Sequence, residues 1–181
     1  MARVLILPGW GDSGEGHWQT LWQQQRGYER VVQRDWLEPR RDDWVHALET
    51  ALEAGPAPAI LVAHSLACSL VAHVAHAKHP AADRVRGALL VAPADVEADL
   101  EEFEAVRSFA PIPMDRLPFP AIVVASRIDP FVRFARAEAM ASAWGARFVD
   151  AGRAGHINVD SGHGPWPEGL ALLDELVAQG S

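Results

Sequence analysis

The chain has 181 residues, of which 49% are hydrophobic, and a formal net charge of −8. This length and this hydrophobic content are typical of one globular domain with a substantial core, and we expect a single domain over residues 1–181. No cluster of basic residues marks a nucleic-acid interface, no apolar stretch is long enough to span a bilayer, and the single cysteine, Cys68, excludes an internal disulfide. We therefore expect a cytoplasmic protein that binds neither nucleic acid nor membrane, and the sequence leaves its oligomeric state open.

The first apolar run, residues 4–7, ends at Pro8-Gly9, which is typical of a buried parallel strand. The loop over residues 9–16 contains four glycines, which allow the backbone to approach a neighbouring group closely. This loop lacks the lysine of a Walker phosphate loop, and its glycine spacing does not fit a dinucleotide-binding fingerprint. A helix with apolar residues on one face follows over residues 17–25.

The same alternation of strands and helices continues to the end of the chain. Asp42 or Asp43 is expected to cap a second helix, and later helices are expected at about 66–78, 131–143 and 168–178. Further strands are predicted over residues 31–32, 59–63, 85–91, 121–126 and 146–150. Strands that alternate with helices predict an α/β fold with a parallel sheet covered on both faces.

Residues 94–120 are the least regular part of the chain. The acidic stretch 96–106 predicts a short helix, and four prolines punctuate the loop that follows it. Because long loops in compact domains are often functional, we interpret this segment as a short lid-like insertion. Its candidate pocket walls are Phe109, Met114 and Phe119.

Ser65 lies between the apolar strand 59–63 and a second apolar run with helical character. A strand, a tight turn and a helix would lift the serine hydroxyl above the sheet and direct the helix N-terminus toward it. The usual form of such a nucleophile elbow is G-x-S-x-G, whereas this chain has Ala63 and Ala67 at the two glycine positions. On this stretch alone, a serine that simply caps a helix is an equally good interpretation.

Two further polar residues follow strands in the same way: Asp129 after the fifth strand and His156 after the sixth. The carboxyl ends of parallel strands meet at one edge of the sheet, where α/β active sites form. The order Ser, Asp, His is that of the α/β-hydrolases. His156 would take the proton of Ser65, and Asp129 would orient the imidazole. The oxyanion hole would use the backbone N–H groups of Leu66 and Trp10.

Several segments together resemble the YdeN-like small serine hydrolases, the bacterial relatives of a retinoblastoma-binding serine hydrolase. The matching segments are residues 7–10 with 17–19 and Trp22, residues 63–66, residues 125–130, residues 155–158 and residues 161–169. The resemblance implies a metal-free and cofactor-free serine hydrolase with Ser65, Asp129 and His156 as its triad. It also implies a three-layer α/β-hydrolase fold whose six-stranded parallel sheet has the order 2-1-3-4-5-6, without a large cap domain. The chain departs from the family pattern at Ala67 and Ile128.

The remaining histidines and aromatic residues have simpler interpretations. His64 is expected to be a packed or hydrogen-bonded neighbour of Ser65, and Cys68 to be buried and unreactive. His73, His76 and His79 repeat every three residues, but a solvated helix face explains them better than a zinc site. The further candidates for the pocket are Gly9, His64, His163 and Trp166.

These patterns predict a serine hydrolase that cleaves a small-molecule ester or a related acyl compound through an acyl-enzyme. A non-catalytic binding module on a hydrolase scaffold is the main alternative, because a fold does not fix a function. A third possibility is transferase or lyase chemistry on the same scaffold.

Overall fold

The computed structural model describes residues 3–56 and 58–179; Met1, Ala2, Ala57, Gly180 and Ser181 lie outside the described part of the chain. Six parallel strands form one sheet in the order β2-β1-β3-β4-β5-β6. Their bounds are β1 Arg3–Leu7, β2 Glu29–Arg30, β3 Ala59–His64, β4 Val85–Val91, β5 Ala121–Ala125 and β6 Arg147–Asp150. This order confirms the predicted sheet and gives the chain an α/β-hydrolase architecture.

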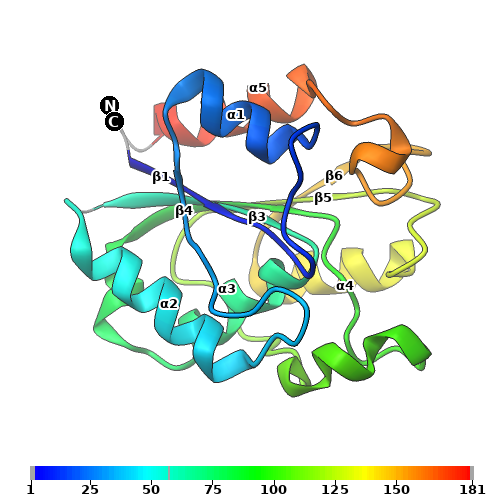
Figure 1. Cartoon of the computed structure of the whole chain (residues 1–181), viewed down its shortest axis with the longest axis horizontal. Helices are drawn as coiled ribbons and strands as arrows, with labels where there is room; N and C mark the ends of the chain where they lie inside the picture. Colours follow the sequence, from blue (N-terminus) through cyan, green and yellow to red (C-terminus); the bar gives the residue numbers. More distant parts are fainter. Residues whose placement is uncertain (1–2, 57, 180–181) are drawn as a thin grey trace.

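Five α-helices cover the sheet on both faces (Figure 1). Helices α1 and α5 lie on one face, and α2, α3 and α4 lie on the other. Their bounds are α1 Trp18–Arg26, α2 Arg41–Ala54, α3 Leu66–His76, α4 Phe134–Trp144 and α5 Pro167–Gln179. Three short 3₁₀ helices complete the described elements: η1 Pro80–Arg84, η2 Glu101–Phe109 and η3 Val159–Ser161. In the described residues, the segment between β4 and β5 holds only η2 and loops, so no large cap interrupts the fold.

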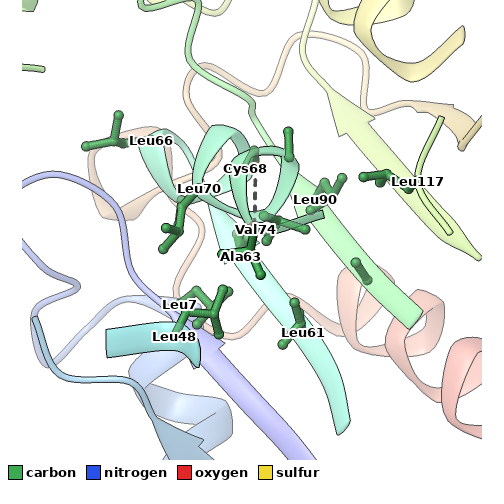
Figure 2. Packing of buried hydrophobic residues seen from close by; sticks show 14 of the residues in the cluster. Leu7, Leu48, Leu61, Ala63, Leu66, Cys68, Leu70, Val74, Leu90 and Leu117 are labelled. Carbon is green, nitrogen blue, oxygen red and sulfur yellow. Dashed lines mark hydrogen bonds between the residues drawn. The ribbon is translucent and has the colours of Figure 1, made fainter. Parts of the chain in front are cut away.

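The two faces of the sheet are apolar because side chains alternate along each buried strand. Ile60 and Val62 of β3 pack with Trp18 and Trp22 of α1 in one core cluster. Leu61 turns to the opposite face and joins the cluster that contains α2 and α3. Figure 2 shows this second cluster, in which the side chains of α3 lie over those of β3. A central strand buried on both sides explains why the run of residues 59–63 contains no polar residue.

The second predicted strand is displaced in the structure. The second strand was predicted over residues 31–32, but it is Glu29–Arg30. Glu29 pairs with Leu5 of β1, and Arg30 pairs with Ile6. Of the two valines that suggested the strand, Val31 is buried whereas Val32 is 69% exposed. Arg3 binds the carboxylate of Glu29 through two nitrogens, which holds this polar edge strand against β1.

The predicted helix cap at Asp42 or Asp43 is also wrong. Residue Arg40 takes the N-cap position of α2 and makes no side-chain capping hydrogen bond. Asp42 and Asp43 lie in the first turn, where their negative charges interact favourably with the helix dipole.

The acidic stretch after β4 forms a 3₁₀ helix rather than the expected helix over 96–106. Phe103, Val106 and Phe109 are buried and recur every third residue of η2. A 3₁₀ helix has three residues per turn, so this spacing places all three on one face. The acidic residues of η2, Glu101, Glu102 and Glu104, are exposed. Among the described helices, none is long and apolar enough to cross a membrane.

Truncation of Leu61 tests the central position of β3. Leu61 is 1% exposed, and Leu61→Ala should lower the free energy of unfolding by about 2–5 kcal/mol because it leaves a cavity between β3 and its covering helices. Val32→Ala is the matched control at an exposed site and should change stability by less than about 0.5 kcal/mol. Urea denaturation measures both, and equal effects would contradict the assignment of β3 to the core.

Candidate active site

Ser65 forms a sharp turn between β3 and α3. Strand β3 ends at His64 and helix α3 begins at Leu66, so Ser65 alone connects them. Its backbone has φ 56° and ψ −119°, a conformation that a residue with a side chain adopts only at an energetic cost. The Ser65 N–H donates to the carbonyl of Val91, and the Ser65 carbonyl accepts from Cys68. These bonds to β4 and to the first turn of α3 hold the strained turn.

Ala63 and Ala67 flank this turn without distorting it. Both methyl groups are fully buried and belong to the core cluster between β3 and the helices that cover this face of the sheet. Close packing against the turn comes instead from Gly9, in the loop after β1. A Cβ atom at Gly9 would lie 2.9 Å from the His64 carbonyl oxygen and 3.0 Å from Ser65 Cβ. The turn therefore requires a glycine in the neighbouring loop rather than beside the serine.

His156 bridges Ser65 and Asp129. Its Nε2 atom lies 2.9 Å from Ser65 Oγ, and its Nδ1 atom lies 2.9 Å from each carboxylate oxygen of Asp129. The Asp129 side chain is completely buried, and the His156 side chain is 9% exposed. The edge of the Phe131 ring packs against the imidazole with 4.7 Å between ring centroids. The three side chains predicted to form a triad thus come together in one hydrogen-bonded chain.

Two other imidazoles lie beside His156. His64 donates from Nε2 to the backbone carbonyl of His156 at 2.9 Å, so the residue before the serine also fixes the loop that carries His156. Burial, together with the nearby His156 and His17, holds the pKa of His64 well below its usual range. Burial and the positive charge of Arg30 lower the pKa of His17 to about 4. Both rings are therefore neutral near pH 7, and of the three only His156 has a carboxylate partner.

Two backbone N–H groups were predicted to face a developing negative charge. Leu66 is the first residue of α3, where backbone N–H groups have no acceptor within the helix. Trp10 follows Gly9, and Gly9 lies next to the Leu66 nitrogen. The Trp10 indole is committed elsewhere, since Nε1 donates to the Leu37 carbonyl at 2.9 Å.

A pocket of about 260 Å³ opens above Ser65. It contains the predicted residues Gly9, Trp10, His64, Ser65 and His156. Sequence reasoning missed the other lining residues: Asp12, His17, Phe103, Phe131, Asn158 and Asp160. Most of these residues lie within, or a few residues from, the segments that resemble the YdeN-like hydrolases. Their proximity to those segments is the sequence signal that could have identified them as pocket residues.

The other predicted pocket residues lie elsewhere. Phe109 and Phe119 are buried in the core, and Phe109 packs edge-on against Trp44. Met114 is 36% exposed and is not part of the pocket lining. The segment 94–120 does supply a pocket wall, but the residue is Phe103, six residues before Phe109 on the same face of η2. The lid-like role of this segment stays a prediction.

Trp166 and His163 line a separate hollow beside the start of α5. Trp166 stacks on Trp22 at 5.9 Å and meets Trp18 edge-on at 5.2 Å, so its ring is part of the core under α1. His163 Nδ1 lies 3.0 Å from the hydroxyl of Ser161. The glycine-rich loop contributes His156, Asn158 and Asp160 to the Ser65 pocket, whereas His163 and Trp166 lie outside that pocket.

Cys68 and the three spaced histidines do not form reactive groups. Burial raises the pKa of the Cys68 thiol, and its sulfur points to the carbonyls of Ala63 and Val91. His73 contacts the Phe109 carbonyl, His76 pairs with Asp115, and His79 accepts from a backbone N–H. Within residues 3–56 and 58–179, no group of histidine, cysteine and acidic side chains is arranged to hold a metal ion.

Comparison with known proteins agrees with this geometry. A family model described as serine hydrolase matches residues 4–175. A YdeN-like hydrolase from Pectobacterium atrosepticum is 34% identical, with a TM-score of 0.85 over 97% of this chain and 90% of that one. The ydeN gene product of Bacillus subtilis, at 21% identity and a TM-score of 0.77 over 98% of this chain and 100% of that one, shares the fold. No curated protein matches the chain.

The contact between Gly9 and the serine turn can be tested with two glycine substitutions. Gly9→Ala should lower the free energy of unfolding by about 1–3 kcal/mol, because its methyl group would overlap the His64 carbonyl. Gly14→Ala, in the same loop, meets nothing within 4 Å and should not destabilise the protein. Thermal and urea denaturation measure both. A Gly9→Ala variant as stable as the wild type would show that the two loops do not approach so closely.

Proposed function

Since the chain belongs to the serine hydrolase family, we propose that it cleaves small esters or related acyl compounds through a Ser65–His156–Asp129 triad. The observation that carries the proposal is the imidazole of His156, which lies within hydrogen-bond distance of a hydroxyl on one side and a carboxylate on the other. A serine hydroxyl is a weak nucleophile until an adjacent base removes its proton.

The first half of the reaction acylates Ser65. His156 Nε2 takes the hydroxyl proton as Ser65 Oγ attacks the acyl carbon, and a tetrahedral intermediate forms. His156 then gives that proton to the leaving oxygen, so that an alcohol departs and an acyl ester of Ser65 remains. Asp129 stabilises the imidazolium that exists between the two proton transfers, and its complete burial strengthens this interaction.

The second half releases the acid. Water takes the place of the alcohol, His156 removes its proton, and the hydroxide oxygen attacks the acyl carbon. The tetrahedral intermediate collapses with return of the proton to Ser65 Oγ, which regenerates the enzyme. In both halves the Leu66 and Trp10 N–H groups would stabilise the oxyanion, and loss of one such donor typically costs about 100-fold or more in rate.

The pocket supports a small acyl group. Its volume of about 260 Å³ lies below the range typical of drug-sized ligand sites. Phe103 and Phe131 provide apolar walls, and no lysine or arginine is part of the lining. The charged residues of the lining are Asp160 and Asp12, which pairs with Arg30, so the lining itself supplies no lysine or arginine for an acidic substrate.

Covalent labelling of Ser65 tests the enzyme assignment directly. A fluorophosphonate probe should form one adduct with the wild-type protein, because it reacts with a serine that an adjacent histidine activates. Ser65→Ala should form none. Ser69→Ala is the matched control one turn along α3, since Ser69 is buried and its hydroxyl binds only the Leu66 carbonyl. It should be labelled like the wild type.

Intact-mass spectrometry with peptide mapping locates the adduct. A folded wild-type protein that takes up no probe would favour the alternative of a non-catalytic binding module. Product analysis with an added alcohol would separate hydrolysis from acyl transfer, because a transferase would yield the new ester.

Asp129→Asn tests which carboxylate supports the base. The amide cannot stabilise the imidazolium and favours the wrong tautomer of His156, so kcat for a p-nitrophenyl ester should fall by about 10⁴-fold. Asp95→Asn is the control, since Asp95 follows β4 at the same sheet edge but pairs with Arg136. This variant should keep its kcat within a few-fold. A large loss in Asp95→Asn and a small one in Asp129→Asn would reverse the assignment.

A further inference from the structure

His17 occupies a position in the pocket that the triad does not explain. It is the N-cap residue of α1, with its Nδ1 atom accepting a hydrogen bond from the Gln19 backbone N–H at 3.2 Å. The residue is only 5% exposed, and it lines the pocket together with Ser65 and His156. Its ring meets the His64 ring edge-on with 4.9 Å between centroids.

The capping bond fixes the tautomer of His17. A nitrogen that accepts from a backbone N–H carries a lone pair, so the proton of the neutral ring is on Nε2. The lowered pKa, about 4, means that this neutral form persists across the ordinary working range of pH. His17 is therefore a fixed N–H donor and not a second base.

The Nε2–H group of His17 has no acceptor among residues 3–56 and 58–179. The other buried or aromatic donors of the lining are already used: Trp10 Nε1 donates to Leu37, and His64 Nε2 donates to His156. The His17 Nε2 atom is not among the fully buried side-chain atoms that lack a partner, so it is open to the pocket, where a ligand or water can accept its hydrogen bond. The pocket thus has a side-chain donor without a protein acceptor on the α1 side, and the rings of Phe103 and Phe131 as apolar walls.

We propose that His17 is a specificity-determining residue that donates a hydrogen bond from Nε2 to an acceptor oxygen within the acyl chain of the substrate. The preferred substrates are then neutral esters whose short acyl chain carries an ether, hydroxyl or carbonyl oxygen, rather than plain alkyl esters of the same length. This inference rests on the proposed function of Ser65, and it names the substrate class of that site.

The acyl chain is the part of the substrate that fits this position. His17 and His64 are buried at the enclosed side of the pocket, whereas Asp12 and Asp160 are exposed at its mouth. The leaving alcohol must depart through the mouth, and the acyl group stays attached to Ser65. A carboxylate in the acyl chain is disfavoured, because Asp160 adds negative charge, Asp12 is already paired with Arg30, and the lining itself adds no lysine or arginine.

Two p-nitrophenyl esters that differ in one atom test the proposal. Methoxyacetate and butyrate have equally long acyl chains, with an ether oxygen in the first where the second has a methylene. The measured quantity is the ratio of kcat/KM for methoxyacetate to kcat/KM for butyrate, since the intrinsic reactivity difference cancels when this ratio is compared between variants. His17→Ser should lower the ratio by about 3- to 10-fold, the effect of one lost hydrogen bond.

Serine is chosen because it keeps the N-cap acceptor while it removes the Nε2–H donor. His17→Thr is a second variant with the same property. The matched control is His79→Ser: His79 caps η1 through the same Nδ1 contact, also at 3.2 Å, and lies outside the pocket. It should leave the ratio at its wild-type value.

Three results would overturn the proposal. The ratio could stay at the wild-type value in both His17 variants. Both esters could lose activity equally, which would place His17 at the reacting carbonyl instead of the acyl chain. His79→Ser could lower the ratio as well. Failure of the proposed function is a different result, because the wild-type protein would then take up no fluorophosphonate at Ser65.

Discussion

The site depends on how closely the loop after β1 approaches the turn after β3. These two strands are neighbours in the sheet, but the helices that follow them, α1 and α3, lie on opposite faces (Figure 1). This arrangement creates the crevice typical of α/β active sites. Gln19 holds the crevice together: its side-chain amide donates to the carbonyls of Leu7 and Val62, and its carbonyl accepts from the Ser13 hydroxyl at 2.6 Å. One fully buried side chain thereby fixes the ends of both strands and the loop that carries Gly9 and Trp10.

Three adjacent imidazoles acquire different chemistry from their partners. The ring centroid of His64 lies 4.9 Å from that of His17 and 4.8 Å from that of His156. Positive charges on two of these three imidazoles would therefore repel each other. Asp129 offers compensating charge to His156 alone. Burial keeps His17 and His64 neutral, and each has one nitrogen committed to the backbone. The environment thus leaves one ring able to carry a proton in the proposed reaction and makes the other two fixed hydrogen-bonding groups.

Ser65, Asp129 and His156 could be located from the sequence because each lies shortly after a predicted strand, and parallel strands deliver their carboxyl ends to one edge. The aromatic walls of the pocket could not be located, since they depend on side-chain direction within irregular segments. Phe103 and Phe109 share the apolar face of η2, yet one lies at the pocket and the other in the core. The predicted position of β2 was wrong because the strand is defined by its pairing with β1 and not by apolar residues.

The two alanines of the serine turn show why a motif is a weak guide when its physical requirement can be met elsewhere. A glycine in G-x-S-x-G leaves room for tight packing around a strained residue. Here the methyl groups of Ala63 and Ala67 fill space in the core between β3 and α3, and Gly9 provides the close contact on the other side of the turn. The unfavourable backbone conformation of Ser65 is held by its hydrogen bonds to Val91 and Cys68. The Ser65 hydroxyl is therefore presented by a strained turn that is supported by these hydrogen bonds and by the close approach of Gly9, and not by glycines beside the serine.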